Sequence, residues 1–572
     1  MSKTVKLFCV VINPGYRSEW RVKEGHLQMS KKELSISYSV LRRWALVFIS
    51  LPMLCFFIGW LRWYWAVPAC LALVVCIIAS DENGRLYKVL FKKKAHDKAG
   101  TSSELSSDGK KLVISRNILI AVVIASFAYV FFCGVGRLWS QSDDFLWRNA
   151  IFRDLVVRKW PVFYDAYDGA LSYYIGTWLP AAIIGKCVFL LGAGTEASFM
   201  VANIAVLIYC TAGMSILFLL LFMHFNVSSP KKAALVIIGL VFFSGMDFVG
   251  NEFKIDSWHI EWWALTFQYS SLTTCMCWVF NQTIIPWVCT ALLLHEKTVS
   301  NYVLIGMACL FCGPFPFIGF FIFCVALGLK RLVETIKAKE GVIFAKEVFS
   351  IPNICSILFI FPIVGAYLTA NTMMSNYESE EAVFLPPTWC FENYVLYILF
   401  MLFEFGIFAI LIAKAFKKNY LFYVMLAELI VFPLFNVGIN SDLTMRGSIP
   451  AIFMLFVFCY QYLLTNKAVT PRHPKAKEHK ESFESLISRI NLLYIILAFC
   501  LMIGAVTPGV ELARGFARVY YRGFNDRSTD LVVTLDRDYN PVPYEERDAW
   551  PPTNFVALNY ENTLFFKVFA KR

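Results

Sequence analysis

Long apolar runs recur along most of this chain, and one of them, Phe199–Phe222, contains no charged side chain. A run of about twenty such residues is long enough for a helix to cross a hydrocarbon core about 30 Å thick. Because lipid offers the backbone no hydrogen-bond partner, spans of this kind must satisfy their own backbone groups. We find no series of short alternating strands typical of a membrane barrel. The sequence therefore predicts an all-α polytopic membrane protein.

The composition agrees with this fold class and excludes one class of partner. Hydrophobic residues make up 58% of the 572 residues, and charged residues only 16%. The net charge of +12 comes from basic residues between the apolar runs, where they orient the chain in the membrane, so we exclude nucleic-acid binding. The 17 cysteines lie mostly inside apolar runs, which indicates neither a disulfide framework nor a zinc site.

The distribution of Lys and Arg predicts how the chain crosses the membrane. The segment up to Arg43 and the segment Asp81–Arg116 are strongly basic, which places both in the cytoplasm. Counting apolar runs from there predicts about thirteen transmembrane helices, with every strongly basic loop on one side. We expect three regions: residues 1–116, with the cytoplasmic N-terminus, a helical hairpin and a basic loop; residues 117–506, a transmembrane domain with external loops 137–198 and 250–274; and residues 507–572, an external segment.

The first external loop is expected to carry two helices of different kinds. Phe145–Trp160 places its apolar residues on one face and its arginines elsewhere, so we expect it to lie in the membrane interface. Leu171–Gly194 is long enough to span, but Pro180 and Lys186 interrupt it. We interpret it as a half-inserted helix of the same loop.

Two adjacent acids, Asp143 and Asp144, follow the predicted outward helix Asn117–Val135. One interpretation is structural, because short acceptors at the start of a helix cap its free amides and complement its dipole. The other is catalytic, because a partly desolvated carboxylate beside a second carboxylate binds a proton more tightly and can act as a base. The two interpretations are compatible.

The layout resembles the GT-C superfamily of membrane glycosyltransferases. It combines an outward helix that ends in an acidic pair, a long first external loop and many further passes with the motif YY-x-G-x-W-L-P, formed by Tyr173, Tyr174, Gly176, Trp178, Leu179 and Pro180. The resemblance covers about Asn117 to Val506. It departs at the start of the chain, where Trp44–Ser80 adds two spans before the acid-bearing helix.

The resemblance implies a reaction and a role for the acids. Such enzymes transfer a sugar from a polyprenyl phosphate or pyrophosphate carrier to an acceptor on the non-cytoplasmic face, commonly with inversion. The first-loop acid of the superfamily maps onto Asp143 or Asp144, as the general base that takes a proton from the acceptor hydroxyl. Asp143 is the first choice, because it lies nearer the end of the membrane helix. The acceptor, a glycan, a lipid or a protein, is left open.

A phosphate leaving group needs cations more than it needs a strong acid. The candidates for binding the donor phosphate are Arg446, Lys186 and Arg148, with Arg153, Arg158 and Lys159 as further possibilities. The alternative for each is a basic side chain that reaches to the membrane interface.

Polar and aromatic residues suited to a sugar or acceptor gather in the second external loop. Carboxylates and an imidazole can bind sugar hydroxyls, and aromatic faces can cover a pyranose ring. The alternatives are an aromatic interfacial belt and plain helix capping. The candidates are Asp256, Trp258, His259 and Glu261 in this loop, Tyr173 in the first loop, and Asn281 and Gln282 in the next helix. No spacing enforces a metal cage, so we expect no metal, although a divalent cation stays open.

Two other classes of function compete with the enzyme. A transporter or flippase for a lipid-linked sugar is favoured by Glu404 and Glu428, ionisable groups near the middle of their spans. Against it, no pair of broken helices stands in corresponding positions of two halves. A non-catalytic scaffold would leave the acidic pair without a purpose. We expect a bacterial plasma membrane as the location, with the endoplasmic reticulum second.

Overall fold

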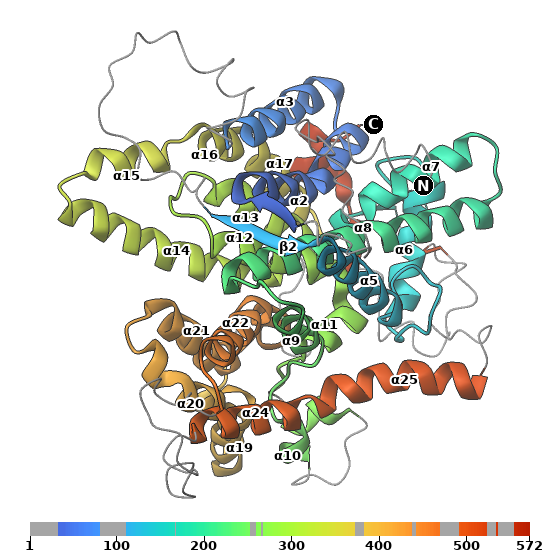
Figure 1. Ribbon diagram of the computed structural model, residues 1–572. Coiled ribbons are helices and arrows are strands. Elements are labelled where there is room, and N and C mark those ends of the chain that lie inside the picture. The colour runs from blue at the N-terminus through green and yellow to red at the C-terminus, as the bar shows by residue number, and fades with distance from the viewer. Residues whose placement is uncertain are drawn as a thin grey trace, which may run out of the picture.

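The structure is a computed structural model. It describes residues 33–80, 110–165, 168–251, 259–264, 267–371, 383–437, 442–468, 491–522, 534–535 and 554–571. Nearly all of the regular structure in these residues is helical (Figure 1). The few strands are short and form small antiparallel sheets of two or three strands.

The first helices are introduced by a pair of strands that the sequence analysis did not predict. Strand β1 (Glu33–Ser37) pairs antiparallel with β2 (Lys111–Ser115). Each strand runs directly into an apolar helix, α2 (Tyr38–Trp60) or α5 (Arg116–Phe132), and in both cases a serine hydroxyl caps the helix. Helix α3 (Trp63–Ala79) packs against α2, as expected for the hairpin.

The first loop region, residues 133–198, folds into short elements around two helices. Helix α6 (Phe145–Val157) follows the acidic pair. Strands β3 (Phe163–Tyr164) and β4 (Gly169–Leu171) lead to the short helix η3 (Gly176–Trp178). The segment Leu171–Gly194, expected to form one half-inserted helix, contains the shorter helix α7 (Leu179–Leu190), which packs along the 31-residue helix α8 (Thr195–Phe225).

The middle of the chain contains a sharply broken helix. The elements up to this point are α9 (Pro230–Val241), α10 (Asp247–Asn251) and η4 (Ile260–Trp262). Helix α11 (Leu272–Val279) and the short helix η5 (Phe280–Gln282) are then bent by 102° from α12 (Ile284–Leu293).

The next helices are also interrupted. Helices α13 (Tyr302–Cys312) and α14 (Pro314–Lys337) meet at Gly313 in the GPFP segment. The chain then continues through α15 (Gly341–Val348), α16 (Ile351–Cys355), the π-helix η6 (Ser356–Ile360) and α17 (Phe361–Leu368).

The last third of the chain has the same pattern of helices joined by irregular turns. The elements before α22 are β5 (Val383–Phe384), η7 (Pro386–Thr388), α19 (Phe391–Met401), the π-helix η8 (Leu402–Gly406), α20 (Ile407–Phe416), α21 (Tyr420–Val431), η9 (Phe432–Leu434), β6 (Phe435–Asn436) and the π-helix η10 (Leu443–Gly447). Strands β5 and β6 pair with each other. The helices that follow are α22 (Ile449–Thr465), α24 (Leu492–Gly504) and α25 (Val506–Arg522).

The C-terminal residues return to the first loop. Strand β7 (Val556–Leu558) joins β4 as the third strand of its sheet. After η14 (Tyr560–Asn562), the π-helix η15 (Phe565–Phe569) packs against α17, and Ala570 bridges to Leu61 at the end of α2. The chain end therefore ties the first loop to the α2–α3 hairpin.

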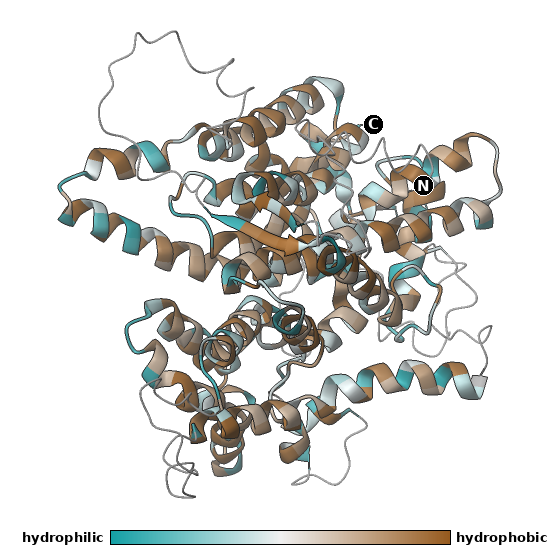
Figure 2. Ribbon diagram, in the orientation of Figure 1, coloured by the Kyte–Doolittle hydropathy of each residue, from teal (hydrophilic) through white to brown (hydrophobic). Residues whose placement is uncertain are grey.

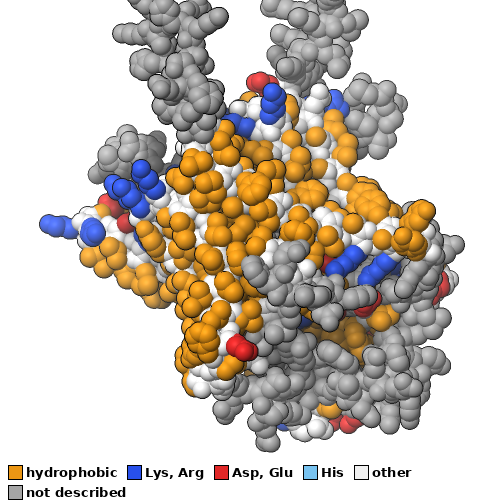
Figure 3. Space-filling view, turned by 90° about the horizontal axis from the view of Figure 1, so that it is seen from below, with side chains coloured by type: hydrophobic (Ala, Val, Ile, Leu, Met, Phe, Trp, Pro, Cys, Tyr) orange, Lys and Arg blue, Asp and Glu red, His pale blue; other side chains and the backbone are white. Residues whose placement is uncertain are grey.

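Among the residues that the structure describes, six helices are long and apolar enough to cross a membrane, or seven if the bent pair α11 and α12 counts as one span. Other apolar helices are shorter, so thirteen full spans are not confirmed. Apolar residues dominate the helices in Figure 2, whereas α25 alternates polar and apolar residues along its length. Hydrophobic side chains cover most of the described part of the face in Figure 3, with Lys and Arg near its edges. These features are those of a membrane-embedded protein.

Helix α6 differs from the expected interfacial helix. Its polar residues Arg148, Asn149 and Asp154 are buried together with its apolar ones. The reason lies in distant residues: one carboxylate oxygen of Asp154 accepts hydrogen bonds from the Tyr164 hydroxyl, the Thr534 hydroxyl and the Leu535 amide. Burial raises the pKa of Asp154, although these donors act against the shift. The amphipathic pattern of a helix cannot indicate whether other segments of the protein cover the polar face of that helix.

The close approach of α8 to α2 and α12 is tested by Gly213→Ala. A Cβ atom at Gly213 would lie 2.3 Å from the Phe48 ring and 2.8 Å from the Ile284 side chain. We expect a loss of stability of about 1–3 kcal/mol from overpacking, measured as a lower melting temperature in detergent. Gly328→Ala in α14 is the matched control, because its Cβ would meet nothing within 4 Å. Equal melting temperatures for the two variants would contradict the packing.

Candidate functional site

Four segments that are far apart in the sequence meet at the first loop region. The Thr177 hydroxyl donates to the Asn281 carbonyl oxygen, which joins η3 to η5. Gly176 lies against Cys312 at the end of α13, and Gly313 lies against Gln282. Helix η10 packs on α14, and Arg446 in η10 reaches back to Tyr174. These contacts form a closed ring of irregular backbone, and the charged cluster described next lies beside it.

Asp144 and Arg148 form the first half of this cluster. Arg148 Nη2 donates to Asp144 Oδ2 at 2.7 Å, across one turn of α6. The Arg148 side chain is only 6% exposed, whereas that of Asp144 is 42% exposed. Asp144 makes no side-chain capping bond, although it stands at the N-cap position. The carboxylate is therefore held by a buried cation rather than by the helix amides.

Two neighbouring tyrosines with tilted rings, Tyr173 and Tyr174, connect this pair to Arg446. The Tyr173 hydroxyl donates to the Tyr174 hydroxyl at 2.5 Å, and Arg446 Nη1 donates to Tyr174 at 3.4 Å. Arg446 Nε lies 3.1 Å from Asp442 Oδ1. Burial by itself lowers the pKa of Arg446, but the Asp442 carboxylate and the phenols outweigh it and raise the pKa above its usual value.

Burial also raises the pKa of both tyrosines, and each phenol lies in the field of Arg148 and Arg446. They keep their protons at neutral pH and can donate to an anion. The backbone of Tyr173 is fixed by Tyr367 of α17, whose hydroxyl donates to the Tyr173 carbonyl at 2.9 Å and accepts from its amide at 3.2 Å. The cluster is thus held in place by a neighbouring helix.

An aromatic wall stands beside these polar groups. The rings of Phe145 and Phe280 stack with centroids 5.6 Å apart, and Trp178 meets Phe280 edge-on. The Arg148 guanidinium lies 5.9 Å from the centre of the Phe145 ring. This wall joins the start of α6, the broken helix and the YY-x-G-x-W-L-P segment.

Asn281 and Gln282 lie in the break between α11 and α12. Both side chains are fully buried, and none of their four side-chain polar atoms has a hydrogen-bond partner among the described residues. Unpaired buried amides are rare, because each costs the hydration that it loses. Their position indicates a place where a bound water or a ligand completes the hydrogen bonding.

The other residues that the sequence predicted to bind phosphate lie outside the cluster of Arg148 and Arg446. Lys186 donates to the Arg158 carbonyl and lies 5.1 Å from the centre of the Trp160 ring. Arg153 and Arg158 each approach the buried Asp154, at 3.5 Å and 3.6 Å. The structure therefore brings Arg148 and Arg446 together and leaves these three cations at the other end of α6.

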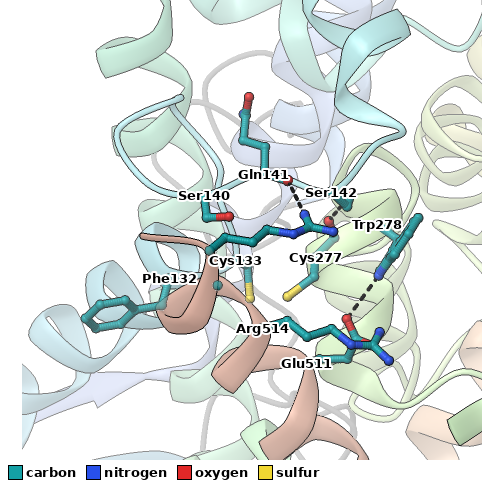
Figure 4. Close-up of a pocket in the computed structure, with 11 residues that line it drawn as sticks. Phe132, Cys133, Ser140, Gln141, Ser142, Cys277, Trp278, Glu511 and Arg514 are labelled. Atoms are coloured by element: carbon teal, nitrogen blue, oxygen red, sulfur yellow. Dashed lines mark hydrogen bonds and ion pairs between the residues drawn. The ribbon is translucent and has the colours of Figure 1, made fainter. Parts of the chain in front are cut away.

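Asp143 faces a different neighbourhood from Asp144. Its side chain is 63% exposed and lies 3.9 Å from Arg518 of α25. Arg518 also donates to the Gln141 carbonyl, on the rim of a pocket between the Ser140–Ser142 segment, α11 and α25 (Figure 4). Cys133 and Cys277 line the same pocket. Asp143 thus approaches a residue that lines the pocket, whereas Asp144 belongs to the arginine cluster.

The described part of the second loop contacts residues that line this pocket. His259 contacts Arg514 and lies 3.7 Å from Glu511, and its ring meets Trp262 and Trp278. Glu261 is buried and accepts hydrogen bonds from the Ser271 amide and the Gln268 side chain. Asp256 and Trp258 lie outside the described residues.

The sequence analysis missed several residues of the arginine cluster and of the pocket between α11 and α25. Asp442 was not singled out, and neither were the residues of α25 and α11 that line the pocket: Trp278, Glu511, Arg514 and Arg518. A signal was available for α25, because Glu511, Arg514 and Arg518 share one face at helical spacing. Nothing in the local sequence pairs Asp442 with Arg446 except their spacing of four residues.

Glu261 gives a prediction about pH. Burial, with Asp247 and Glu511 nearby, raises its pKa to about 8. The folded protein therefore binds this proton more tightly than the unfolded chain, so stability is greatest below about pH 4.5 at this site and falls as the pH rises to about 8. We expect Glu261→Gln to remove this part of the pH dependence, measured as melting temperatures in detergent between pH 5 and pH 8. Parallel curves for the unchanged protein and the variant would contradict the assignment.

No group of three or more His, Cys, Asp and Glu within the described ranges is arranged to hold a metal ion. Comparison of the chain with family models, with curated proteins and with solved structures finds no match.

Proposed function

We propose that this protein is a membrane glycosyltransferase of the GT-C type. It transfers a sugar from a phosphorylated polyprenyl carrier to an acceptor, with inversion and with an aspartate of the first loop as general base. One observation carries the proposal: a solvent-accessible carboxylate, Asp144, lies in one cluster with Arg148, Arg446 and two phenols. Such a cluster provides the base and the cations that this reaction needs.

Arg148 can bind a phosphate group while it still pairs with Asp144, the proposed general base. Its Nη2 binds Asp144, whereas its Nε and Nη1 have no hydrogen-bond partner among the described residues. A phosphate oxygen bound to these nitrogens and to Arg446 sits beside Asp144. The aromatic wall of Phe145, Phe280 and Trp178 then covers the sugar, and Asn281 and Gln282 offer amides to its hydroxyls.

The geometry favours Asp144 over Asp143 as the base. Asp144 pairs with Arg148 of the arginine cluster, while Asp143 lies 3.9 Å from Arg518, which lines the pocket beside α25. We place the acceptor on that side, so that its hydroxyl meets Asp144 from the pocket while the donor phosphate leaves towards the arginines. His259 and Glu261 stand near the same pocket and are the acceptor-side residues of this proposal.

The location follows from the same proposal. The acceptor side is the external face, the N-terminus is cytoplasmic and the membrane is a bacterial plasma membrane, with the endoplasmic reticulum second. The acceptor is a glycan, a lipid or a protein of the cell envelope. The reaction uses no metal ion or other cofactor in this proposal.

A lipid-linked sugar transporter is the second candidate, and two observations favour it. The bent pair α11 and α12 breaks at buried amides, as in helices that bind a transported substrate. Both carboxylate oxygens of Glu428 are buried without a hydrogen-bond partner in the described part of the chain. The experiment below separates the two candidates.

The test measures the rate at which sugar is transferred from farnesyl-phosphate-linked glucose, mannose or galactose to membranes of the cells that express the protein. We expect Asp144→Asn to lower the rate about 100-fold or more, because it removes the general base. Asp143→Asn is the matched control and keeps most of the rate. Transfer that survives in Asp144→Asn but fails in Asp143→Asn would reverse the assignment. The absence of transfer by the unchanged protein with all three sugars would favour the transporter.

A further inference from the structure

Two cysteine side chains meet at the pocket between α11 and α25. Cys133 is the C-cap residue of α5, Cys277 lies in α11, and both line the pocket. Figure 4 shows their sulfur atoms directed toward each other, and the two thiols are in hydrogen-bonding contact. Both cysteines are free thiols in the structure. Only a short approach separates such a contact from a disulfide, in which the sulfur atoms lie about 2.05 Å apart.

The turn that leads to the acidic pair is held at both ends by Cys277. The turn begins at Cys133, which contacts the Cys277 thiol. It ends at Ser142, whose hydroxyl donates to the Cys277 carbonyl oxygen at 3.0 Å. Asp143 follows directly in the sequence. A covalent bond between the two cysteines therefore fixes the segment from which Asp143 extends.

Access from the pocket distinguishes this pair from a second pair of cysteines in contact. Cys289 of α12 and Cys309 of α13 also interact through their thiols, but both are fully buried and neither lines the pocket. Cys277 is half-buried, whereas Cys133 is only 2% exposed. A small reagent that enters the pocket therefore meets Cys277 first, with the Cys133 thiol directly beside it.

We propose that Cys133 and Cys277 form an oxidation site that closes to a disulfide. The pocket is on the side that the proposed function assigns to the outside, where thiols meet an oxidising environment. The chemistry of the pair itself needs no sugar transfer.

The oxidant that this site takes is a small disulfide. The Cys277 thiolate attacks one sulfur of the oxidant, so that a mixed disulfide forms and the first thiol leaves. The Cys133 thiolate then attacks the Cys277 sulfur, the bond between the two cysteines forms, and the second thiol leaves. The protein loses two protons and two electrons, and the oxidant is reduced to two thiols.

The experiment oxidises the full-length protein in detergent with hydroxyethyl disulfide at about pH 8.5, where about half of ordinary thiols are ionised. The remaining thiols are blocked with N-ethylmaleimide, and the digested protein is analysed by mass spectrometry. We expect most molecules to yield a peptide pair joined between Cys133 and Cys277. Joining of Cys289 to Cys309 should be about tenfold less frequent or rarer, because the oxidant cannot reach buried thiols.

The disulfide also changes stability, because a covalent link restricts the unfolded chain. We expect oxidation to raise the melting temperature in detergent by about 2 °C or more. Cys277→Ser should abolish this rise, and Cys133→Ser should do the same if the first variant does not fold. Cys289→Ser is the matched control, which removes a thiol from the buried pair and should keep the rise.

The outcomes separate this inference from the proposed function. Free thiols at both positions after oxidation overturn the inference, and so does a mixed disulfide that stays on Cys277. Equal joining of the two pairs also overturns it, because the pocket then makes no difference. A bond between Cys133 and Cys277 in a protein that transfers no sugar keeps this inference and contradicts only the glycosyltransferase.

Discussion

Backbone hydrogen bonding in lipid is the constraint on which this structure depends. Since the hydrocarbon offers no partner, helices can break only where other protein segments cover the free amides and carbonyls. The breaks at η3, η5, Gly313 and η10 lie against one another. Each of these four breaks supplies neighbours for the next, so they form one ring. Because the backbone of this ring is irregular, it orients side chains toward the neighbouring charged cluster that straight helices would direct elsewhere.

The ring also explains why the charges are tolerated. Arg148 and Arg446 are held by carboxylates four residues earlier on their own helical segments, so each pair forms locally and needs no exact alignment of distant helices. Tyr174 then joins the two pairs across about 270 residues of sequence. A buried ion pair is costly to desolvate, and it persists where hydrogen bonds satisfy both partners. Arg148 meets this condition only in part, which is why we regard it as a ligand-binding group.

The C-terminal part of the chain stabilises the first loop from outside. Strand β7 extends the β3–β4 sheet, and residues Thr534 and Leu535 donate to the buried Asp154. Helix α25 contributes Arg518 to the backbone of Gln141, next to the acidic pair. The loop that carries both acids is thus held by contacts from more than 350 residues further along the chain.

The sequence by itself determined where helices form and which polar residues interrupt them, because hydropathy and proline act locally. The hairpin α2–α3, the break at Gly313 and the start of α7 at Pro180 follow from such local signals. The grouping of Arg148 with Arg446, the burial of α6 and the separation of Lys186 from the cluster were decided by the tertiary structure alone. Each depends on which distant segment covers a given face, and no periodic pattern in one helix contains that information.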